Sequence, residues 1–153
     1  DISEFCRAHA AHNRVDAGVG DADPAGTDRT PQLFLFGGPA ERDRMERLRS
    51  AEPCRGLVRI TVDSLDDLAS VVAACDLLIC GDTLVMHLGQ ALRVPQVVLF
   101  GPTAHTEIAV TGQKIVSPYS CGPCYLRRCD IQPSCMSAIG PRQVLAAGMD
   151  LLG

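Results

Sequence analysis

The alternation of short apolar runs with segments of helical periodicity constrains this chain most. The runs "LFLF", "LLI" and "VVLF" are continuously apolar, unlike a strand that faces water on one side. Strands of that kind are covered on both faces, as in parallel sheets whose crossover helices lie on either side. The sequence therefore predicts an α/β fold, a Rossmann-like parallel sheet sandwich of three layers. We expect its parallel strands in one sheet, near residues 32–36, 57–61, 76–80 and 96–100.

The predicted helices have recognisable ends. Ser64 precedes "LDDLASVVAAC" as an N-cap with an acidic first turn, Asp82 is the expected cap of "TLVMHLGQALR", and Pro141 opens "PRQVLAAGMDLL". The charged segment "PAERDRMERLRSAE" is predicted as a surface helix, and "ISEFCRAHAAH" as a helix followed by a Gly- and Asp-rich loop. Between Gly101 and Pro141 we find no periodicity and predict neither strand nor helix.

Composition limits the classes of function. With 153 residues, 46% hydrophobic and 21% charged, the chain can bury the core of one domain. A net charge of -4 without any run of Lys and Arg argues against a nucleic-acid surface and a basic membrane-attracting face. The apolar runs are too short to cross a bilayer, and no charged-then-apolar leader indicates a targeting peptide. We expect a globular domain, or a piece of a longer protein.

Polar residues stand where the third predicted strand ends and a helix begins. In parallel sheets, ligands bind beyond the carboxyl ends of the strands. We expect Asp82 to cap this helix. The next three N–H groups, of Thr83, Leu84 and Val85, are then free donors that favour a phosphate at the positive end of the helix dipole. The Thr83 hydroxyl can reach the same phosphate, and His87 can face the cleft. The alternative is a simple cap followed by a core histidine.

A family resemblance rests on these segments. "GDTLVMHLGQALRVPQVVLFGPT", preceded by "FLFGGPAERD" and "SLDDLASVVAACDLLI", resembles the C-terminal domain of glycosyltransferase family 9, the ADP-heptose:lipopolysaccharide heptosyltransferases. The family's usual form is Asp-Thr/Ser-Gly, two residues and His, then a strand ending in Phe/Tyr-Gly-Pro-Thr/Ser. The resemblance runs from roughly Gln32 to Leu151. It implies that residues 1–153 are the single, partial, nucleotide-sugar-binding C-terminal domain of a GT-B enzyme, with the N-terminal acceptor domain absent from this chain.

The resemblance also implies a set of donor-binding residues. Glu41, after "GGPA", resembles the acidic residue that holds the donor ribose, and a carboxylate can accept two hydrogen bonds from a diol. The alternative for Glu41 is a first-turn acid stabilised by the helix dipole. The residues that resemble the diphosphate and sugar site are Asp82, Thr83, Leu84, Val85 and His87.

The chain departs from the family in two respects. The family commonly has Gly where this chain has Leu84, whose side chain is expected to crowd a phosphate against the helix start. The family's first C-domain strand, the lysine after it and the acceptor domain with its proposed acidic base have no counterpart here. We therefore assign no catalytic residue and expect this chain alone to be inactive. The turn of Gly101, Pro102 and Thr103 is expected to face the Asp82 segment and shape the cleft.

For the whole protein, the resemblance implies a cytoplasmic glycosyltransferase. It would transfer a sugar from a nucleotide diphosphate donor of the ADP-heptose type to a lipopolysaccharide-type glycolipid, which the missing N-terminal domain binds. The free amides would stabilise the departing diphosphate, while a base from the missing domain removes the acceptor proton. This chemistry requires no metal, nucleic acid or transmembrane segment. Any peripheral attachment to the inner membrane is expected through the missing half.

Eight cysteines are many for a chain of this length. Cys75 and Cys80 bracket an apolar strand, where a thiol behaves as a small buried hydrophobe, and Cys6 and Cys54 have no obvious partner in sequence. The other four follow the pattern C-x2-C-x4-C-x5-C, which is dense enough to hold Zn²⁺ or an iron–sulfur cluster as a structural site. Reduced or partly disulfide-paired cysteines that staple a long loop are the alternative. These four residues are Cys121, Cys124, Cys129 and Cys135.

Two other classes of function compete with the transferase. A thiol redox or metal-binding module would be built on Cys121-Gly-Pro-Cys124, but it needs this motif at a helix N-terminus, whereas here it lies in a Pro- and Gly-rich stretch. A nucleotide-binding regulatory or orphan domain without transfer activity is also compatible with the sequence, because this chain lacks the catalytic half.

Overall fold

The computed structural model describes residues 33–50 and 58–153. It divides into two compact units, Asp1–Asp63 and Ser64–Gly153, which we describe separately as unit 1 and unit 2. The helix predicted over residues 2–12, Cys6, Cys54 and the loop before the first strand lie outside the described residues. That the units form one domain stays a prediction. No helix of the described segments is long and apolar enough to cross a bilayer.

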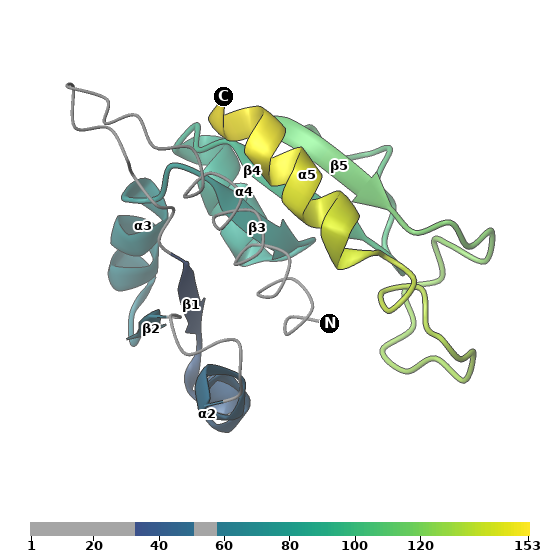
Figure 1. Ribbon diagram of the computed structural model, residues 1–153, viewed down its shortest axis with the longest axis horizontal. Coiled ribbons are helices and arrows are strands. Elements are labelled where there is room, and N and C mark those ends of the chain that lie inside the picture. The colour runs from purple at the N-terminus through teal and green to yellow at the C-terminus, as the bar shows by residue number, and fades with distance from the viewer. Residues whose placement is uncertain (1–32, 51–57) are drawn as a thin grey trace, which may run out of the picture. The chain divides into compact units, whose positions relative to one another are not determined.

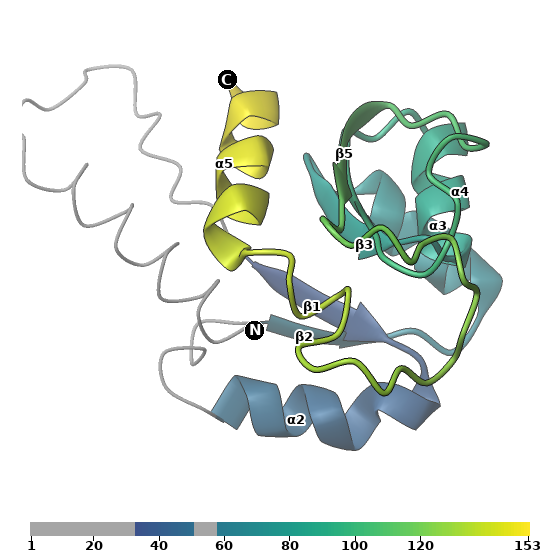
Figure 2. The same cartoon turned by 90° about the vertical axis from the view of Figure 1, so that its right-hand side faces the viewer.

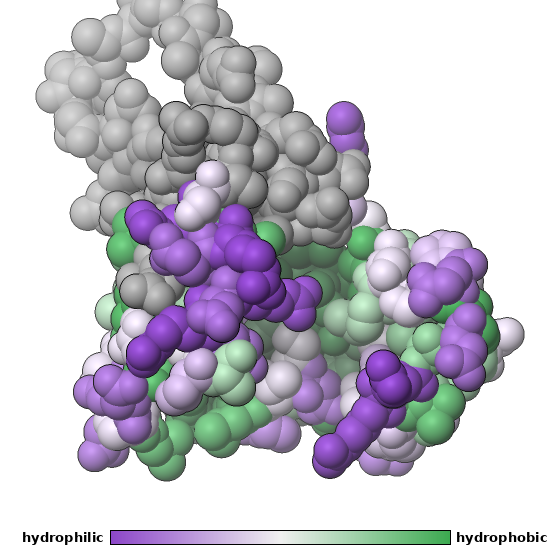
Figure 3. Space-filling view, turned by 90° about the horizontal axis from the view of Figure 1, so that it is seen from below, coloured by the Kyte–Doolittle hydropathy of each residue, from purple (hydrophilic) through white to green (hydrophobic). Residues whose placement is uncertain are grey.

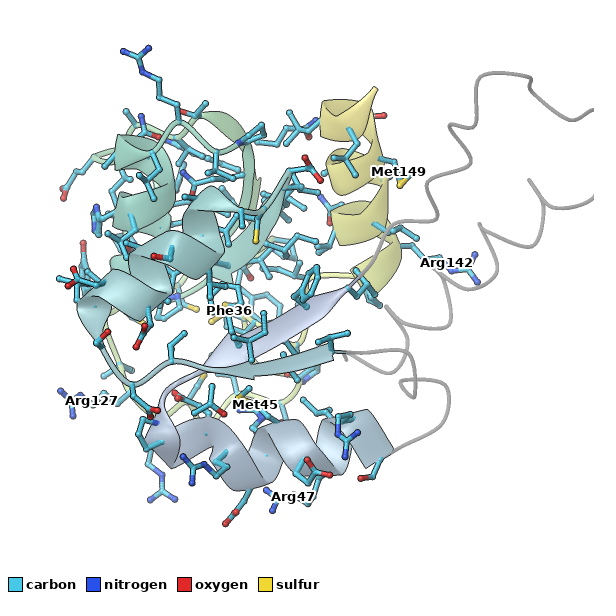
Figure 4. All side chains as sticks on the ribbon, turned by 90° about the vertical axis from the view of Figure 1, so that its left-hand side faces the viewer. Phe36, Met45, Arg47, Arg127, Arg142 and Met149 are labelled. Carbon is cyan, nitrogen blue, oxygen red and sulfur yellow. The ribbon has the colours of Figure 1, made fainter. Side chains whose placement is uncertain are left out.

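Unit 1 holds two parallel strands and a charged helix. The strands β1 and β2 pair in register from Phe34 opposite Val58, as predicted for a parallel sheet. Met45 is the buried residue of α2, and Figure 4 shows it on the side of the helix toward the strands, with Arg47 on the opposite side. The outer face of α2 is strongly hydrophilic (Figure 3). The described elements are β1 (Phe34–Gly37), the 3-10 helix η1 (Pro39–Glu41), α2 (Arg42–Ser50) and β2 (Val58–Thr61).

Unit 2 is a three-layer sandwich built on a parallel sheet in the order β3-β4-β5 (Figure 1). Helix α5 covers one face of the sheet, and α4 with α3 covers the other (Figure 2). This arrangement confirms the predicted parallel pairing of the two strands that flank α4, since a helix-length crossover requires it. The elements are α3 (Leu65–Ala73), β3 (Leu78–Gly81), α4 (Leu84–Ala91), β4 (Gln96–Phe100), β5 (Gly112–Val116) and α5 (Pro141–Leu152).

The core of unit 2 lies on both faces of β4. Val97, Val98 and Phe100 are completely buried, as the continuous apolar run predicts for a strand covered on both sides. Val98 and Phe100 pack with Met86 of α4. Helix α4 can approach the sheet this closely because of Gly89, where an added Cβ would lie 2.9 Å from the side chain of Gln96. The packing therefore holds α4 tightly on β3 and β4.

Two helix ends agree with the sequence. Ser64 caps α3, since its Oγ accepts the Asp67 amide at 3.0 Å, and Pro141 occupies the first turn of α5. Helix α4 ends at Ala91, and Arg93 after it takes a left-handed conformation with φ 58°. Its amide donates to the Gln90 carbonyl.

Two predictions about the strands need correction. The strands do not pair in one sheet, because the described backbone hydrogen bonds join β1 to β2 and β3 to β4 to β5. The segment after Gly101 also contains a strand, β5, that we did not predict. In β5 only Ile115 is buried, because the strand lies at the edge of its sheet. An edge strand of this composition lacks the apolar run that revealed its neighbours.

Candidate functional site

The candidate site begins where β3 ends and α4 starts. Thr83, and not Asp82 as predicted, is the N-cap of α4, because its backbone is extended (φ -147°, ψ 174°) and its carbonyl accepts the amides of Met86 and His87. The Thr83 side chain does not cap the helix. Its hydroxyl donates to the Gly81 carbonyl at 3.4 Å, a long and therefore weak hydrogen bond. Asp82 consequently lies just outside the helix.

The first turn of α4 offers free backbone donors. Since the Met86 and His87 amides donate to Thr83, the amides of Leu84 and Val85 have no acceptor within the helix. The first turn carries no acidic side chain. Unpaired N–H groups and the positive end of the helix dipole together favour an anion at this point.

The side chains of this segment differ in exposure. Thr83 and His87 are exposed and lie four residues apart, which places them on one face of the helix start. Because His87 is exposed, our alternative interpretation of it as a core histidine is wrong. Leu84 is 57% exposed, so its side chain faces solvent at the helix start. Val85 is half-buried.

The turn after β4 lies next to this helix start. In the parallel register Gly81 is opposite Leu99, so the carboxyl ends of β3 and β4 are adjacent. The turn of Gly101, Pro102 and Thr103 follows directly, as the sequence predicts. Thr103 Oγ1 is buried and has no hydrogen-bond partner in the described part of the chain.

A half-buried thiol lies in β3, the strand that leads to the helix start. Cys80 is half-buried and packs against the cluster of Met86, Val98 and Phe100. Burial, and secondarily the negative charge of Asp82, raises the pKa of the Cys80 thiol to about 11. Burial also raises the pKa of Cys75, with Asp76 adding to it. Both thiols therefore behave as the small apolar groups that the sequence predicts.

Lys114 and His105, which we did not predict as site residues, both lie near the Phe100 ring at the end of β4. Lys114 of β5 donates to the His105 carbonyl at 2.7 Å, and its Nζ lies 6.0 Å from the centre of the Phe100 ring. The His105 ring meets the same phenyl ring edge to face, with centroids 6.3 Å apart. We missed Lys114 because we missed β5. The only strand signal in its sequence "GQKIV" is the pair of β-branched residues Ile115 and Val116.

Glu41 belongs to unit 1 and lies at the carboxyl end of β1. It closes η1, where its amide donates to the Gly38 carbonyl at 3.1 Å. The carboxylate folds back over the strand end, because Cβ atoms built on Gly37 and Gly38 would lie 3.4 and 3.3 Å from its Oε2. The exposed Glu41 thus follows a strand end, as predicted, and its role in binding the donor stays a prediction.

The four clustered cysteines lie in residues 118–136, which we call the cysteine loop. All four are free thiols; Cys121 is exposed, Cys124 and Cys129 are half-buried, and Cys135 is buried. Among the described residues no group of three or more His, Cys, Asp or Glu side chains is placed to hold a metal ion. As placed, these four cysteines do not form a tetrathiolate site. Metal binding by them stays a prediction. The Cys121-to-Cys124 motif does not open a helix, unlike a thiol redox motif.

Comparison with known proteins identifies relatives of the chain. The family model described as "Glycosyltransferase family 9 (heptosyltransferase)" matches residues 26–134. "Lipopolysaccharide heptosyltransferase 1" of Pseudomonas aeruginosa is 36% identical over 103 residues, 65% of this chain and 28% of that protein. "Lipooligosaccharide heptosyltransferase 2" of Campylobacter jejuni is 31% identical over 94 residues, 58% of this chain and 30% of that protein. The chain thus spans less than a third of the length of either relative.

A solved structure shares the fold. The crystal structure of the glycosyl transferase family 9 from Veillonella parvula superposes with a TM-score of 0.68 over 97% of this chain and 40% of that one. Their sequences are 21% identical. The similarity supports the Rossmann-like fold predicted from the sequence.

Proposed function

Because the chain belongs to glycosyltransferase family 9, the heptosyltransferase family, we propose that it is the donor-binding part of a glycosyltransferase. The donor is a nucleotide diphosphate sugar of the ADP-heptose type, and the acceptor is a hydroxyl of a lipopolysaccharide-type glycolipid. The acceptor and the catalytic base bind to, or come from, the part of the enzyme beyond this chain. The observation that carries the proposal is the helix start at Thr83, where free amides, a hydroxyl and an exposed imidazole meet at a strand end.

The helix start suits the leaving group of such a reaction. When the sugar departs, negative charge develops on the terminal phosphate of the nucleotide. The Leu84 and Val85 amides and the dipole of α4 are fixed by packing, so they can stabilise this charge without reorganising. The Thr83 hydroxyl donates only weakly to Gly81 and can turn to a phosphate oxygen. These groups offset the charge without a metal ion.

Glu41 and Leu84 would set the identity of the donor. The exposed Glu41 carboxylate can accept hydrogen bonds from both hydroxyls of a ribose. The Leu84 side chain narrows the approach to the helix start, and this restricts how the diphosphate and its sugar lie against the free amides. We propose a cytoplasmic enzyme, since nucleotide sugars are the substrate, with any inner-membrane attachment made through the rest of the protein.

Donor binding to variants of the full-length enzyme tests the proposal. Thr83→Ala and His87→Ala should each weaken binding of the nucleotide sugar by about 1–3 kcal/mol, because hydrogen bonds to charged phosphate are lost. Isothermal titration calorimetry measures this directly. Ser70→Ala is the matched control, since it removes an exposed hydroxyl from α3. The Ser70 Oγ donates to the Asp66 carbonyl of the same helix at 2.8 Å.

The outcome separates the transferase from its alternatives. Unchanged donor affinity in both variants would mean that the segment only starts the helix and does not bind the donor. Normal nucleotide binding without sugar transfer to any glycolipid acceptor would favour a nucleotide-binding regulatory domain.

A further inference from the structure

The cysteine loop returns to the carboxyl end of β4 instead of leaving the sheet. Figure 1 shows the segment between β5 and α5 as loops beyond the ends of the strands. Within it, the amides of Cys124 and Tyr125 both donate to the Pro102 carbonyl, at 2.9 and 2.8 Å. Two hydrogen bonds saturate the acceptor capacity of one carbonyl oxygen. The loop therefore holds the peptide between Pro102 and Thr103 in one orientation.

Tyr125 makes its hydrogen bond from a strained backbone. Its φ of 54° lies in the left-handed region, which is uncommon for a residue with a bulky side chain. The Tyr125 ring is 61% exposed, so side-chain burial does not explain this conformation. In this conformation the Tyr125 amide donates to the Pro102 carbonyl.

The other end of the loop packs on Gly101. A Cβ added there would lie 2.6 Å from Met136 Sδ and 2.9 Å from Cys135 Sγ, closer than side chains normally approach. The φ of Gly101 is not positive, so this position requires a small residue because of space and not because of backbone conformation. The Tyr119 hydroxyl donates to the Pro133 carbonyl at 2.9 Å, which ties the two ends of the loop together.

We propose that the cysteine loop positions the turn of Gly101, Pro102 and Thr103 against the start of α4, and so sets the affinity of the enzyme for its donor. Cys135 and Met136 are positioning residues that act through Gly101, and neither contacts the substrate. The inference rests on the proposed function, because it gives the turn a role in donor binding. It assigns the cysteine-rich segment a task that requires neither metal nor disulfide.

A double-mutant cycle between Gly101 and Met136 in the full-length enzyme tests the contact. Gly101→Ala should raise the dissociation constant of the nucleotide sugar at least tenfold, because the added methyl group displaces the turn from the loop. Met136→Ala alone should change it less than threefold, since the Met136 side chain is 41% exposed and can be shortened without unfolding the chain. In Gly101→Ala/Met136→Ala, removal of the nearest obstacle should restore the constant in part, to at least threefold below that of Gly101→Ala, a departure from additivity. The restoration is partial because Cys135 Sγ still lies 2.9 Å from the added methyl group.

The readout distinguishes positioning from simple destabilisation. Enzyme that is irreversibly misfolded lowers the calorimetric stoichiometry and the apparent kcat but leaves the dissociation constant of the folded fraction unchanged. Reversible unfolding raises the apparent constant only by the inverse of the folded fraction, which circular dichroism measures in the same sample. Leu126→Ala is the control, because Leu126 is 60% exposed in the same loop. It should leave the constant at the parent value.

Two results would overturn the inference in different ways. An unchanged constant in Gly101→Ala, or a raised constant that Met136→Ala fails to restore, refutes the positioning role and leaves donor binding intact. Failure of the parent enzyme to bind any nucleotide sugar refutes the proposed function and the positioning role with it.

Discussion

Of the glycine-to-alanine substitutions that we consider, Gly112→Ala should lower the free energy of unfolding of unit 2 the most. Gly112 is the first residue of β5 and pairs with Gln96 of β4. Its φ of +136° is a conformation that residues with a side chain rarely adopt. A Cβ at this position would lie 2.2 Å from the Gln96 carbonyl oxygen and 2.8 Å from the Gln96 nitrogen. Both obstacles are backbone atoms, which cannot turn aside.

The magnitude follows from three terms. Forcing a residue with a side chain to a positive φ costs roughly 1–2 kcal/mol, and overpacking against fixed atoms costs about 1–3 kcal/mol. The lower conformational entropy of unfolded Ala returns about 0.4–1 kcal/mol. The net loss is about 1–5 kcal/mol, a large part of the roughly 5–15 kcal/mol by which domains are usually stable. The amide of Gln96, which donates to the Thr111 carbonyl at 2.8 Å, would also be displaced.

Urea unfolding followed by circular dichroism measures this loss. Gly140→Ala is the matched control, because a Cβ there meets nothing within 4 Å and its φ is -75°. The control should lose less than about 1 kcal/mol, the usual cost of replacing glycine by alanine at a helix N-cap. A loss below about 0.5 kcal/mol in Gly112→Ala would refute the register of β5 on β4, since that register places Gln96 against Gly112.

Two further predictions concern the thiols. Because the pKa of Cys80 is raised from 9.0 to about 11, its contribution to stability is complete below pH 9 and is lost as the pH rises through 11. Urea midpoints measured at pH 8, 10 and 11 should therefore fall more steeply with pH in the parent than in Cys80→Ala. An equal fall of the midpoint in both proteins would contradict the burial of this thiol. For the cysteine cluster, a metal site requires the four sulfurs to gather to about 2.3 Å from one ion, so it predicts about one equivalent of zinc or iron in protein purified without chelator, whereas less than about a tenth of an equivalent would leave four free thiols in the loop.

Local patterns were sufficient for the elements with strong sequence signals. The apolar run of β4 predicted burial on both faces, and Val97 and Val98 are completely buried. Ser64 and Pro141 marked helix starts by chemistry that acts within a few residues. These features were predictable because their causes lie in neighbouring residues.

Other features depend on contacts between distant residues. Asp82 and Thr83 are both good N-cap residues, so composition could not decide between them, and the extended backbone of Thr83 did. The edge strand β5 was missed because the Lys114 and Val116 side chains face outward and only Ile115 enters the core. The pairing of strands into two sheets is likewise a property of the folded chain.

The cysteine pattern suggested a metal site because the sequence shows the spacing of the cysteines but not how their side chains pack. In the structure Cys135 is buried against Gly101, and the amide of Cys124, not its sulfur, fixes Pro102. Whatever the thiols bind, the segment already has a structural role that accounts for its position.

Glycine serves the candidate site in two physically different ways. Gly112 is required for its positive φ, whereas Gly89 and Gly101 are required for space. At Gly89 a methyl group would meet Gln96, which is completely buried, so α4 would have to move away from the sheet and carry the Leu84 and Val85 amides with it. At Gly101 the obstacles are the Sδ of Met136, which is 41% exposed, and the Sγ of the buried Cys135, and both belong to the cysteine loop. The geometry of the helix start is therefore set rigidly by the core, and that of the facing turn is set by a loop that a single substitution can release.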